Sequence, residues 1–350
     1  MDFGAQARQT IRADGRACGV VLNAIGAGLQ PLAAASRLAM LLRHILREQP
    51  SACASFCLHL FLDSPQLKQL ADSGLIRVAT RIWDVISPYP SVPPVRNTNH
   101  AQGTPQMWLM RLASLLASRE YDVLIFMDSD AFPCPGIERL ISWFASSGLH
   151  VASAQPVVPH SGSFGLKARP EPMGGLQPSE KQAWLGFSER NLGFGMLARR
   201  KPQVGELLHR FEAEFIMHMN DTRIRVNADQ SAWRSALFWA KVQRGSIKEQ
   251  MLPQGQVCRM LHRSLHEHRA RHGNASCGKC VVMHHKAVEN YIRLPAWHAI
   301  PHVRTTDLRS LLHDLLKKSL RNRIVPLRCD VASRRVHDES LLSVVEDKSI

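Results

Sequence analysis

The feature that most constrains the fold is a run of five apolar residues, Val123–Met127, in the middle of the chain. A strand that is apolar on both faces has to be covered on both sides, which is typical of the central strands of a parallel sheet flanked by helices. The run ends at Asp128-Ser129-Asp130, so two carboxylates one residue apart follow the strand directly. Ligands of open α/β sheets bind beyond the carboxyl ends of the strands. The segment therefore predicts a fold class and the place of a site.

Short apolar runs alternate with helical periodicity from about residue 18 to residue 155. This alternation predicts an α/β domain with a mostly parallel sheet flanked by helices. The first strand is expected to begin at Val20. Further strands are expected over Phe56–Leu62, Leu75–Ile82, Val123–Met127, Gly193–Leu197 and Val281–Met283. Helices are expected after Ser64-Pro65 and Thr104-Pro105, and over about Ala228–Ala240.

The chain divides into three predicted segments. These are an N-terminal tail over residues 1–17, the α/β domain over 18–295, and a C-terminal helical extension with a polar tail over 296–350. Within the domain, residues 155–179 hold five prolines and four glycines. This density predicts a long loop without regular structure.

The net charge of +15 favours anionic partners, among them nucleotide phosphates, nucleic acid and acidic lipid. The sequence holds no RNA-recognition motif and no dense run of Lys and Arg, so we expect no nucleic-acid partner. No stretch reaches the roughly 18 apolar residues of a membrane span, and none is expected in this chain. The compartment stays open between a secretory lumen, if an anchor is missing from this sequence, and the cytoplasm.

Eight cysteines in 350 residues do not predict a disulfide scaffold. Cys277 and Cys280 form a CxxC among six histidines, which leaves a zinc site, a local disulfide and free thiols as alternatives. Two sequons, Asn220-Asp221-Thr222 and Asn274-Ala275-Ser276, are acceptors for N-glycosylation only in a secretory compartment. Two sequons are also expected by chance in a chain of this length, so they do not decide the compartment.

Asp128 and Asp130 are spaced so that both carboxylates can reach one hard dication, Mn²⁺ or Mg²⁺. Such an ion can bridge the phosphates of a nucleotide-sugar and neutralise the charge on the departing diphosphate. The alternative is a pair of turn-forming aspartates at a strand end. The buried strand before the pair favours the metal site.

The segment Tyr121–Phe132, YDVLIFMDSDAF, resembles the strand and DxD motif of the GT-A nucleotide-diphospho-sugar transferases, especially their retaining galactosyl-, glucosyl- and arabinosyltransferase-like groups. Further landmarks follow in the order that this family has them, over roughly residues 18–290: Arg111, seventeen residues before Asp128, then Asn191-Leu192-Gly193, Asp229-Gln230 and His284-His285-Lys286. The resemblance implies a GT-A fold. It also implies metal-dependent transfer of a sugar from a nucleoside-diphosphate donor, expected to be a UDP-sugar, to a hydroxyl of a glycan or protein acceptor.

The resemblance assigns roles residue by residue. The metal ligands would be Asp128, Asp130 and one of His284 and His285. The catalytic residues beside the donor sugar would be Asp229 and Gln230. The donor-binding residues would be Asn23, Ala24, Arg111, Asp128, Ser129, Asp130, Asn191, Gly193 and Lys286. Of these, Asn23 and Ala24 are assigned from position alone, because the loop Asn23–Gly28 follows the first strand, where a nucleotide base and ribose would lie.

Each landmark also has a purely structural explanation. Arg111 flanks an apolar stripe, where arginine side chains often extend to water. Asn191-Leu192-Gly193 fits a turn. Asn227 and Gln230 fit the start of a helix, and Asp229 would then complement its dipole. The glycines that the family usually has near the late histidine are missing, which weakens the assignment of Lys286 to the phosphates.

Two other functions remain as alternatives. A phosphohydrolase with a nucleophilic aspartate usually has Thr or Val two residues after the second Asp, where this chain has Phe132. A basic protein that binds nucleic acid or glycan without catalysis would fit the charge. Among transferases, retention of configuration is expected, because no second base is evident near Asp229; Glu212 and Glu214 belong to a separate amphipathic helix.

Overall fold

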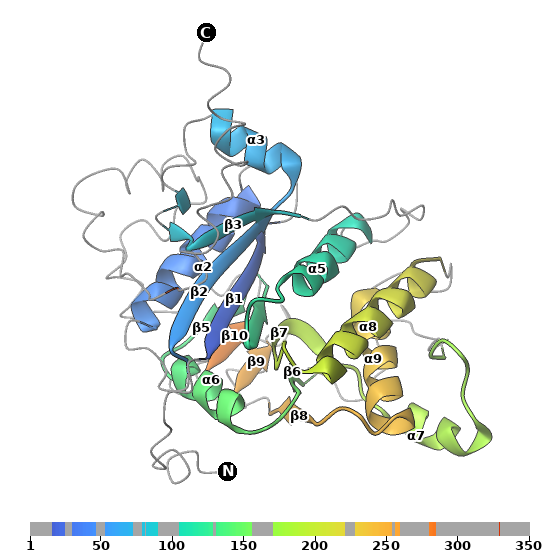
Figure 1. Cartoon of the computed structure of the whole chain (residues 1–350). Coiled ribbons are helices and arrows are strands. Elements are labelled where there is room, and N and C mark those ends of the chain that lie inside the picture. Colours follow the sequence, from blue (N-terminus) through green and yellow to red (C-terminus); the bar gives the residue numbers. More distant parts are fainter. Residues whose placement is uncertain are drawn as a thin grey trace, which may run out of the picture.

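The computed structural model of the chain describes residues 16–24, 30–46, 53–72, 79–80, 82–89, 105–128, 131–155, 171–220, 228–253, 256–259, 280–284 and 329. Within these ranges the protein is an α/β fold, with a seven-stranded sheet between two layers of helices (Figure 1). No helix of the described ranges is long and apolar enough to cross a membrane.

The large sheet has the order β3-β2-β1-β4-β7-β6-β8. Its strands are β1 (Ala17–Ala24), β2 (Ser55–Leu62), β3 (Val85–Pro88), β4 (Val123–Met127), β6 (Val151–Ala154), β7 (Asn191–Leu197) and β8 (Glu249–Leu252). Only β7 runs against its neighbours, and every other pair in this sheet is parallel. The prediction of an α/β fold with a mostly parallel sheet is therefore confirmed.

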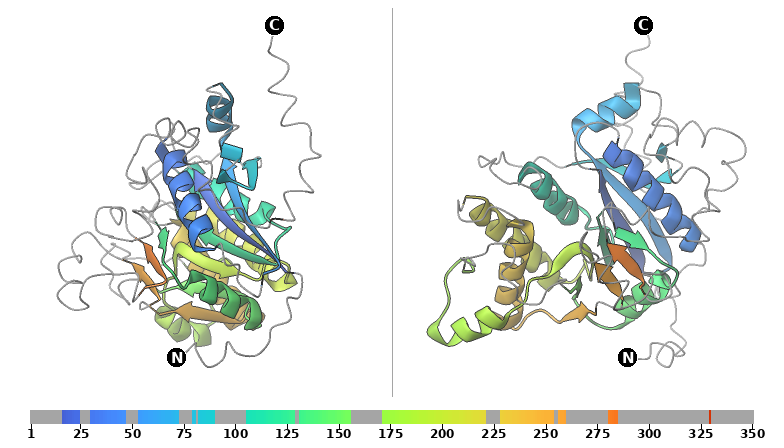
Figure 2. Two further views of the ribbon diagram at one scale, coloured as in Figure 1. Left: turned by 90° about the vertical axis from the view of Figure 1, so that its left-hand side faces the viewer. Right: turned by 180° about the vertical axis from the view of Figure 1, so that it is seen from behind.

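A second, three-stranded sheet lies beside the end of β4. Its strands are β5 (Ala131–Pro133), β10 (Val282–His284) and β9 (Val257–Arg259), in the order β5-β10-β9. Strand β10 pairs antiparallel with β5 and parallel with β9 (Figure 2). The pairing brings a late segment of the chain next to the residues that follow Asp128.

Strand β4 explains why helices cover both faces of the large sheet. Val123, Ile125 and Met127 point to the core formed with α2 (Gln30–Ile45) and α6 (Ile137–Ser146). The intervening Leu124 and Phe126 point to the core formed with the helices of the other layer. Side chains alternate along a strand, so a wholly apolar run fills two cores at once. The other layer comprises α5 (Pro105–Ala117), α8 (Pro202–Asn220) and α9 (Ala228–Phe238).

Smaller helical segments complete the described structure. They are α3 (Ser64–Asp72), η2 (Pro178–Glu180), α7 (Lys181–Gly186) and η3 (Trp239–Gln243), which continues α9. Helices α3 and α5 include the proline of their predicted start signals, Ser64-Pro65 and Thr104-Pro105. Residues 171–177 have no helix or strand, in line with the expected loop, whose residues 156–170 lie outside the described ranges. The last two residues of the expected loop, Pro178 and Ser179, instead belong to η2. The extension expected over residues 296–350 also lies outside them, apart from Cys329.

One strand prediction is wrong. Leu75–Ile82 was expected to be extended, but Ala79, Thr80 and Ile82 are helical, and the edge strand β3 begins only at Val85. An apolar run of this length fits a buried helical segment as well as a strand. Here Ile82 is fully buried in the core on the α2 side.

The cysteines form long-range disulfides, which the sequence did not predict. The bonds Cys18–Cys53, Cys57–Cys329 and Cys258–Cys280 have Cα–Cα distances of 5.7, 4.9 and 5.8 Å. No described cysteine is free. The bond from Cys280 to Cys258 rules out both a local disulfide with Cys277 and a role of Cys280 as zinc ligand. Spacing along the sequence does not reveal such pairings, because folding brings the partners together from distant positions.

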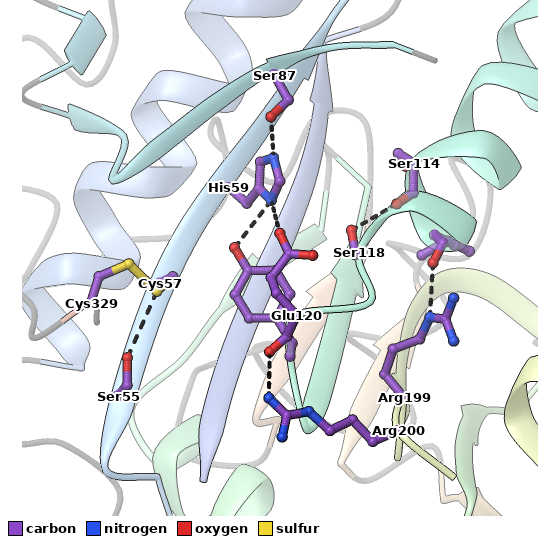
Figure 3. Close-up of polar contacts among 12 residues, drawn as sticks. Ser55, Cys57, His59, Ser87, Ser114, Ser118, Glu120, Arg199, Arg200 and Cys329 are labelled. Carbon is purple, nitrogen blue, oxygen red and sulfur yellow. Dashed lines mark hydrogen bonds and ion pairs between the residues drawn. A yellow bond between two sulfur atoms is a disulfide. The ribbon is translucent and has the colours of Figure 1, made fainter. Parts of the chain in front are cut away.

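A buried histidine links three segments of the large sheet. His59 of β2 has Nε2 2.9 Å from the hydroxyl of Ser87 on β3, and Nδ1 3.1 Å from the hydroxyl of Tyr121, just before β4 (Figure 3). The Glu120 carboxylate lies 3.7 Å from the same Nδ1. The ring of Tyr121 is fully buried and covers Gly19 of β1.

Gly19 should not tolerate a side chain. A Cβ at this position would lie 2.5 Å from Cγ of Tyr121, whose ring is fixed by burial and by the contact with His59. We expect Gly19→Ala to lower the free energy of unfolding by about 1–3 kcal/mol, as overpacking does. Urea denaturation measures this. Gly205→Ala is the control: no atom lies within 4 Å of its Cβ, and alanine should stabilise α8 by roughly 0.5–1 kcal/mol. Equal stability of Gly19→Ala and the wild type would contradict the packing of Tyr121.

Candidate active site

Asp128 follows β4 at the carboxyl edge of the large sheet. Its backbone N–H donates to the carbonyl of Gly193 at 2.9 Å, and its own carbonyl accepts from Ala131 N–H at 2.9 Å. The backbone is therefore held from β7 on one side and from β5 on the other. The side chain keeps 21% of its surface exposed. The first carboxylate of the DxD motif is thus fixed in position and accessible.

Arg111 of α5 connects two carboxylates of the site. Its Nη2 lies 2.8 Å from Oδ1 of Asp128, and its Nη1 lies 3.2 Å from Oδ2 of Asp229. The arginine side chain is 24% exposed, so its charge is only partly screened by water. Arg111 therefore does more than extend to solvent from the flank of its helix: it joins two residues that the sequence placed in the same site.

Asp229 lies in the first turn of α9 and is almost completely buried. Burial raises the pKa of this carboxyl, and the negative charge of Asp128 raises it further, while the Arg111 guanidinium and the N–H of Gln230 lower it. The Gln230 N–H donates to Oδ1 of Asp229 at 2.9 Å, so the carboxylate also satisfies a free N–H of the helix start. The structural and the site explanations of Asp229 are therefore compatible.

Strand β7 carries the Asn-Leu-Gly element along the side of β4. Phe194 pairs with Met127, which places Gly193 beside Asp128. Asn191 is the first residue of β7 and pairs with Ala154; its side chain is not among those described. The element is therefore extended strand from its first residue and not a turn.

The ends of β1, β2 and β3 lie at the same edge as Asp128. Ala24 pairs with Leu62, and Asn23 with Phe61. The N–H of Tyr89, the residue after β3, donates to the carbonyl of Leu62 at 2.9 Å. Of Asn23 and Ala24 only the backbone is described, and the loop 25–29 lies outside the described ranges. The parallel strands thus place the backbone of Asn23 and Ala24 and the first aspartate of the DxD motif, Asp128, along one edge.

Tyr89 lies at this edge, within the field of Arg111, and the sequence did not indicate it. Burial raises the pKa of its phenol well above the ordinary value, Arg111 lowers it and Asp63 raises it, so the ring lies within the field of both charges. Its centroid is 5.9 Å from that of Phe61. The residue was missed because the strand before it was expected ten residues earlier in the chain. An aromatic residue directly after a correctly placed β3 would have been the signal.

His284 approaches the DxD motif through its backbone. It pairs with Ala131 on β5, three residues after Asp128. Its side chain is not described, and Ser129, Asp130, His285 and Lys286 lie outside the described ranges. Among the residues that are described, no group of three or more His, Cys, Asp or Glu side chains could hold a metal ion. Of the expected metal ligands, the structure therefore describes the side chain of Asp128 and the backbone of His284.

No family model and no curated protein matches the sequence. Among solved structures, mouse xyloside xylosyltransferase 1 matches at 13% identity and a TM-score of 0.41, over 80% of this chain and 99% of the other. The galactosyltransferase LgtC, with donor and acceptor sugar analogues, matches at 12% identity and 0.43, over 87% and 99%. A 4-diphosphocytidyl-2C-methyl-D-erythritol synthase from Anaerococcus prevotii also matches, at 8% and 0.34, over 69% and 88%. A shared fold does not by itself define a reaction.

Removal of Arg111 should leave two carboxylates without their shared cation. We expect Arg111→Met to lower the free energy of unfolding at pH 7 by about 1–3 kcal/mol, because Asp229 is then buried without a charged partner. The variant raises the pKa of Asp229 further, so its folded state binds a proton more tightly than the unfolded state. The loss should therefore shrink as the pH is lowered. Urea denaturation of the variant and the wild type at pH 7 and at successively lower pH values tests this prediction.

Two variants make this test specific. Asp229→Asn in the Arg111→Met background removes the unpaired charge and should restore much of the stability. Arg139→Met is the matched control, because that arginine is 80% exposed and should change stability little. A pH-independent loss, or one shared by Arg139→Met, would contradict the electrostatic role of Arg111.

Proposed function

We propose that the chain is a metal-dependent glycosyltransferase that moves a sugar from a nucleoside-diphosphate donor to an acceptor hydroxyl. The observation that carries the proposal is the position of Arg111 between Asp128 and Asp229 at the carboxyl edge of the sheet. Open α/β sheets bind their ligands at this edge. The Arg111 guanidinium at this edge can bind a diphosphate, and the carboxylate of Asp229 beside it can accept hydrogen bonds from sugar hydroxyls.

The donor diphosphate would lie against Arg111. A guanidinium presents a planar fork of N–H donors that matches phosphate oxygens, and its charge offsets theirs. Tyr89 and the backbone of Asn23 and Ala24 lie along the same edge, on the side of β1 to β3, and support a nucleotide base and ribose there. The chain's net charge of +15 favours approach of such an anion. A UDP-sugar is the expected donor, and Lys286 is proposed as a second phosphate contact.

The proposed metal ligands have the chemistry that a hard dication prefers. Asp128 offers a partly exposed carboxylate on a backbone held from two strands. Asp130 and one of His284 and His285 are proposed to complete the ligands, and Ser129 to contact the donor between them. A bound Mn²⁺ or Mg²⁺ would supply neutralisation of the charge on the departing diphosphate. Asp128 can serve such an ion only by sharing its carboxylate between the metal and Arg111, or by exchanging one for the other.

The sugar would lie between α9 and β7. Asp229 and Gln230 begin α9, and Gly193 lies beside Asp128 on β7, with Asn191 two residues before it. A buried carboxylate held by Arg111 is positioned to accept hydrogen bonds from sugar hydroxyls, and the amides of Gln230 and Asn191 can donate or accept. These residues are proposed to orient the anomeric carbon toward the acceptor.

The decisive experiment incubates the purified chain with Mn²⁺ and a panel of nucleotide-sugars and measures nucleoside-diphosphate release. We expect release from one donor, its loss on chelation, and a loss on the order of a hundredfold or more in Asp128→Asn and Asp130→Ala, which remove metal ligands. Asp72→Asn, an exposed carboxylate on α3, is the control and should retain full activity. Calorimetry with UDP and Mn²⁺ should show the same loss of affinity.

Other outcomes of this experiment identify the alternatives. Unchanged UDP affinity in Asp128→Asn and Asp130→Ala with Mn²⁺ would overturn the metal site. Hydrolysis of a generic aryl phosphate, with no donor turned over, would favour a phosphohydrolase. Salt-sensitive binding of RNA or heparin without any metal dependence would favour a basic binding protein.

The transfer should proceed with retention of configuration. An inverting transferase needs a general base to deprotonate the acceptor. Glu214 of α8 is not proposed as this base, because it accepts the Met173 N–H through both oxygens and pairs with Arg210. We therefore expect an α-linked donor to give an α-linked product. The anomeric proton coupling of the first product, measured by NMR, tests this, and a β-linkage would overturn the roles given to Asp229 and Gln230.

A further inference from the structure

The disulfides carry information about the compartment in which this chain folds. All seven cysteines within the described ranges are disulfide-bonded. The three bonds with both partners described have Cα–Cα distances of 4.9 to 5.8 Å, as disulfides require. Structural disulfides form and persist in oxidising compartments and are rare in the cytosol. Pairing of every described cysteine therefore favours the secretory pathway over the cytoplasm.

The bond between Cys57 and Cys329 shows that the cross-links belong to the core. Cys57 lies in the middle of β2, is fully buried, and packs in the same cluster as Tyr121 and Phe61. Its partner comes from 272 residues further along the chain (Figure 3). A pair so distant in sequence meets only when the sheet has formed. The disulfide therefore joins a fully buried cysteine of the sheet to a partly buried one from the late part of the chain.

The asparagine of a glycosylation sequon lies at an exposed helix end of the same fold. Asn220 is the last residue of α8 and opens the sequon Asn220-Asp221-Thr222. The residues before it, His218 and Met219, are buried, whereas Asn220 itself is exposed. Helix α8 packs along α9, and its end lies at the rim of the molecule (Figure 1). A glycan on Asn220 would extend into solvent without displacing any core side chain.

We propose that Asn220 is an N-linked glycosylation site of this chain and that the chain folds in an oxidising secretory compartment. The two observations are independent, since one concerns buried cysteines and the other an exposed asparagine. Both point to the same compartment, because a sequon is modified only where the oligosaccharide is available, and that compartment also forms disulfides. The inference does not depend on the proposed transfer reaction.

The test expresses the full chain behind a cleavable secretion signal in a eukaryotic cell line. The secreted protein is digested with peptide N-glycosidase, and mass spectrometry of peptides reads conversion of Asn220 to Asp. We expect Asn220 to be converted in the wild type and in Thr222→Ser, which keeps the sequon. Asn220→Gln and Thr222→Ala should each lose one glycan. Asn274→Gln, in the second sequon, is the matched control and should leave the occupancy of Asn220 unchanged.

Disulfide mapping on the same samples tests whether the bonds form in an oxidising secretory compartment. Non-reducing peptide maps should contain Cys57–Cys329 and Cys258–Cys280 in the glycosylated protein. Secreted chain with unmodified Asn220 would overturn the proposal. So would a glycan found only on chains that lack these two bonds, because it would then be incompatible with the fold. Retention of the wild type inside the cell without the bonds would equally contradict it. None of these measurements uses transferase activity, so the proposed function can fail without affecting this result.

Discussion

The structure depends on the burial of β4 on both of its faces. Five consecutive apolar side chains divide between two cores, so helices have to cover the sheet on each side. The same strand carries Asp128 at its carboxyl end, and its neighbours β1 and β7 bring their own ends to that edge. The chain can change direction there only by leaving the sheet, which exposes polar backbone and side chains to solvent. The requirement that buries the strand thus also creates the site.

Arg111 connects the helical layer to this edge. It comes from α5, reaches Asp128 after β4, and reaches Asp229 at the start of α9. Three elements that pack through apolar contacts are therefore also joined by charge at the site. Burial alone would favour protonation of Asp229, whereas the guanidinium favours its ionised form. The balance between these two effects decides how much negative charge the site presents to a ligand.

Local signals could be predicted from the sequence and long-range ones could not. Strand β4 and the starts of α3 and α5 follow from an apolar run and from Ser-Pro and Thr-Pro pairs, all of which act within a few residues. Leu75–Ile82 was misassigned because an apolar run is ambiguous until its packing partner is known. Arg111 and Asp229 were both identified as site residues, but their ion pair joins positions 118 residues apart. The disulfides and the field around Tyr89 depend in the same way on segments that meet only after folding.

The bond between Cys57 and Cys329 closes the chain into a covalent ring. The 272-residue separation covers most of the described elements, from Cys57 within β2 to beyond β10. An unfoldase that threads a polypeptide through a narrow pore would reach the disulfide as a branch point in the chain. It has to pass two polypeptide strands side by side or wait for a reductase to open the bond. Degradation by that route would therefore depend on the thiol chemistry of the surroundings, even though no cysteine takes part in the proposed reaction.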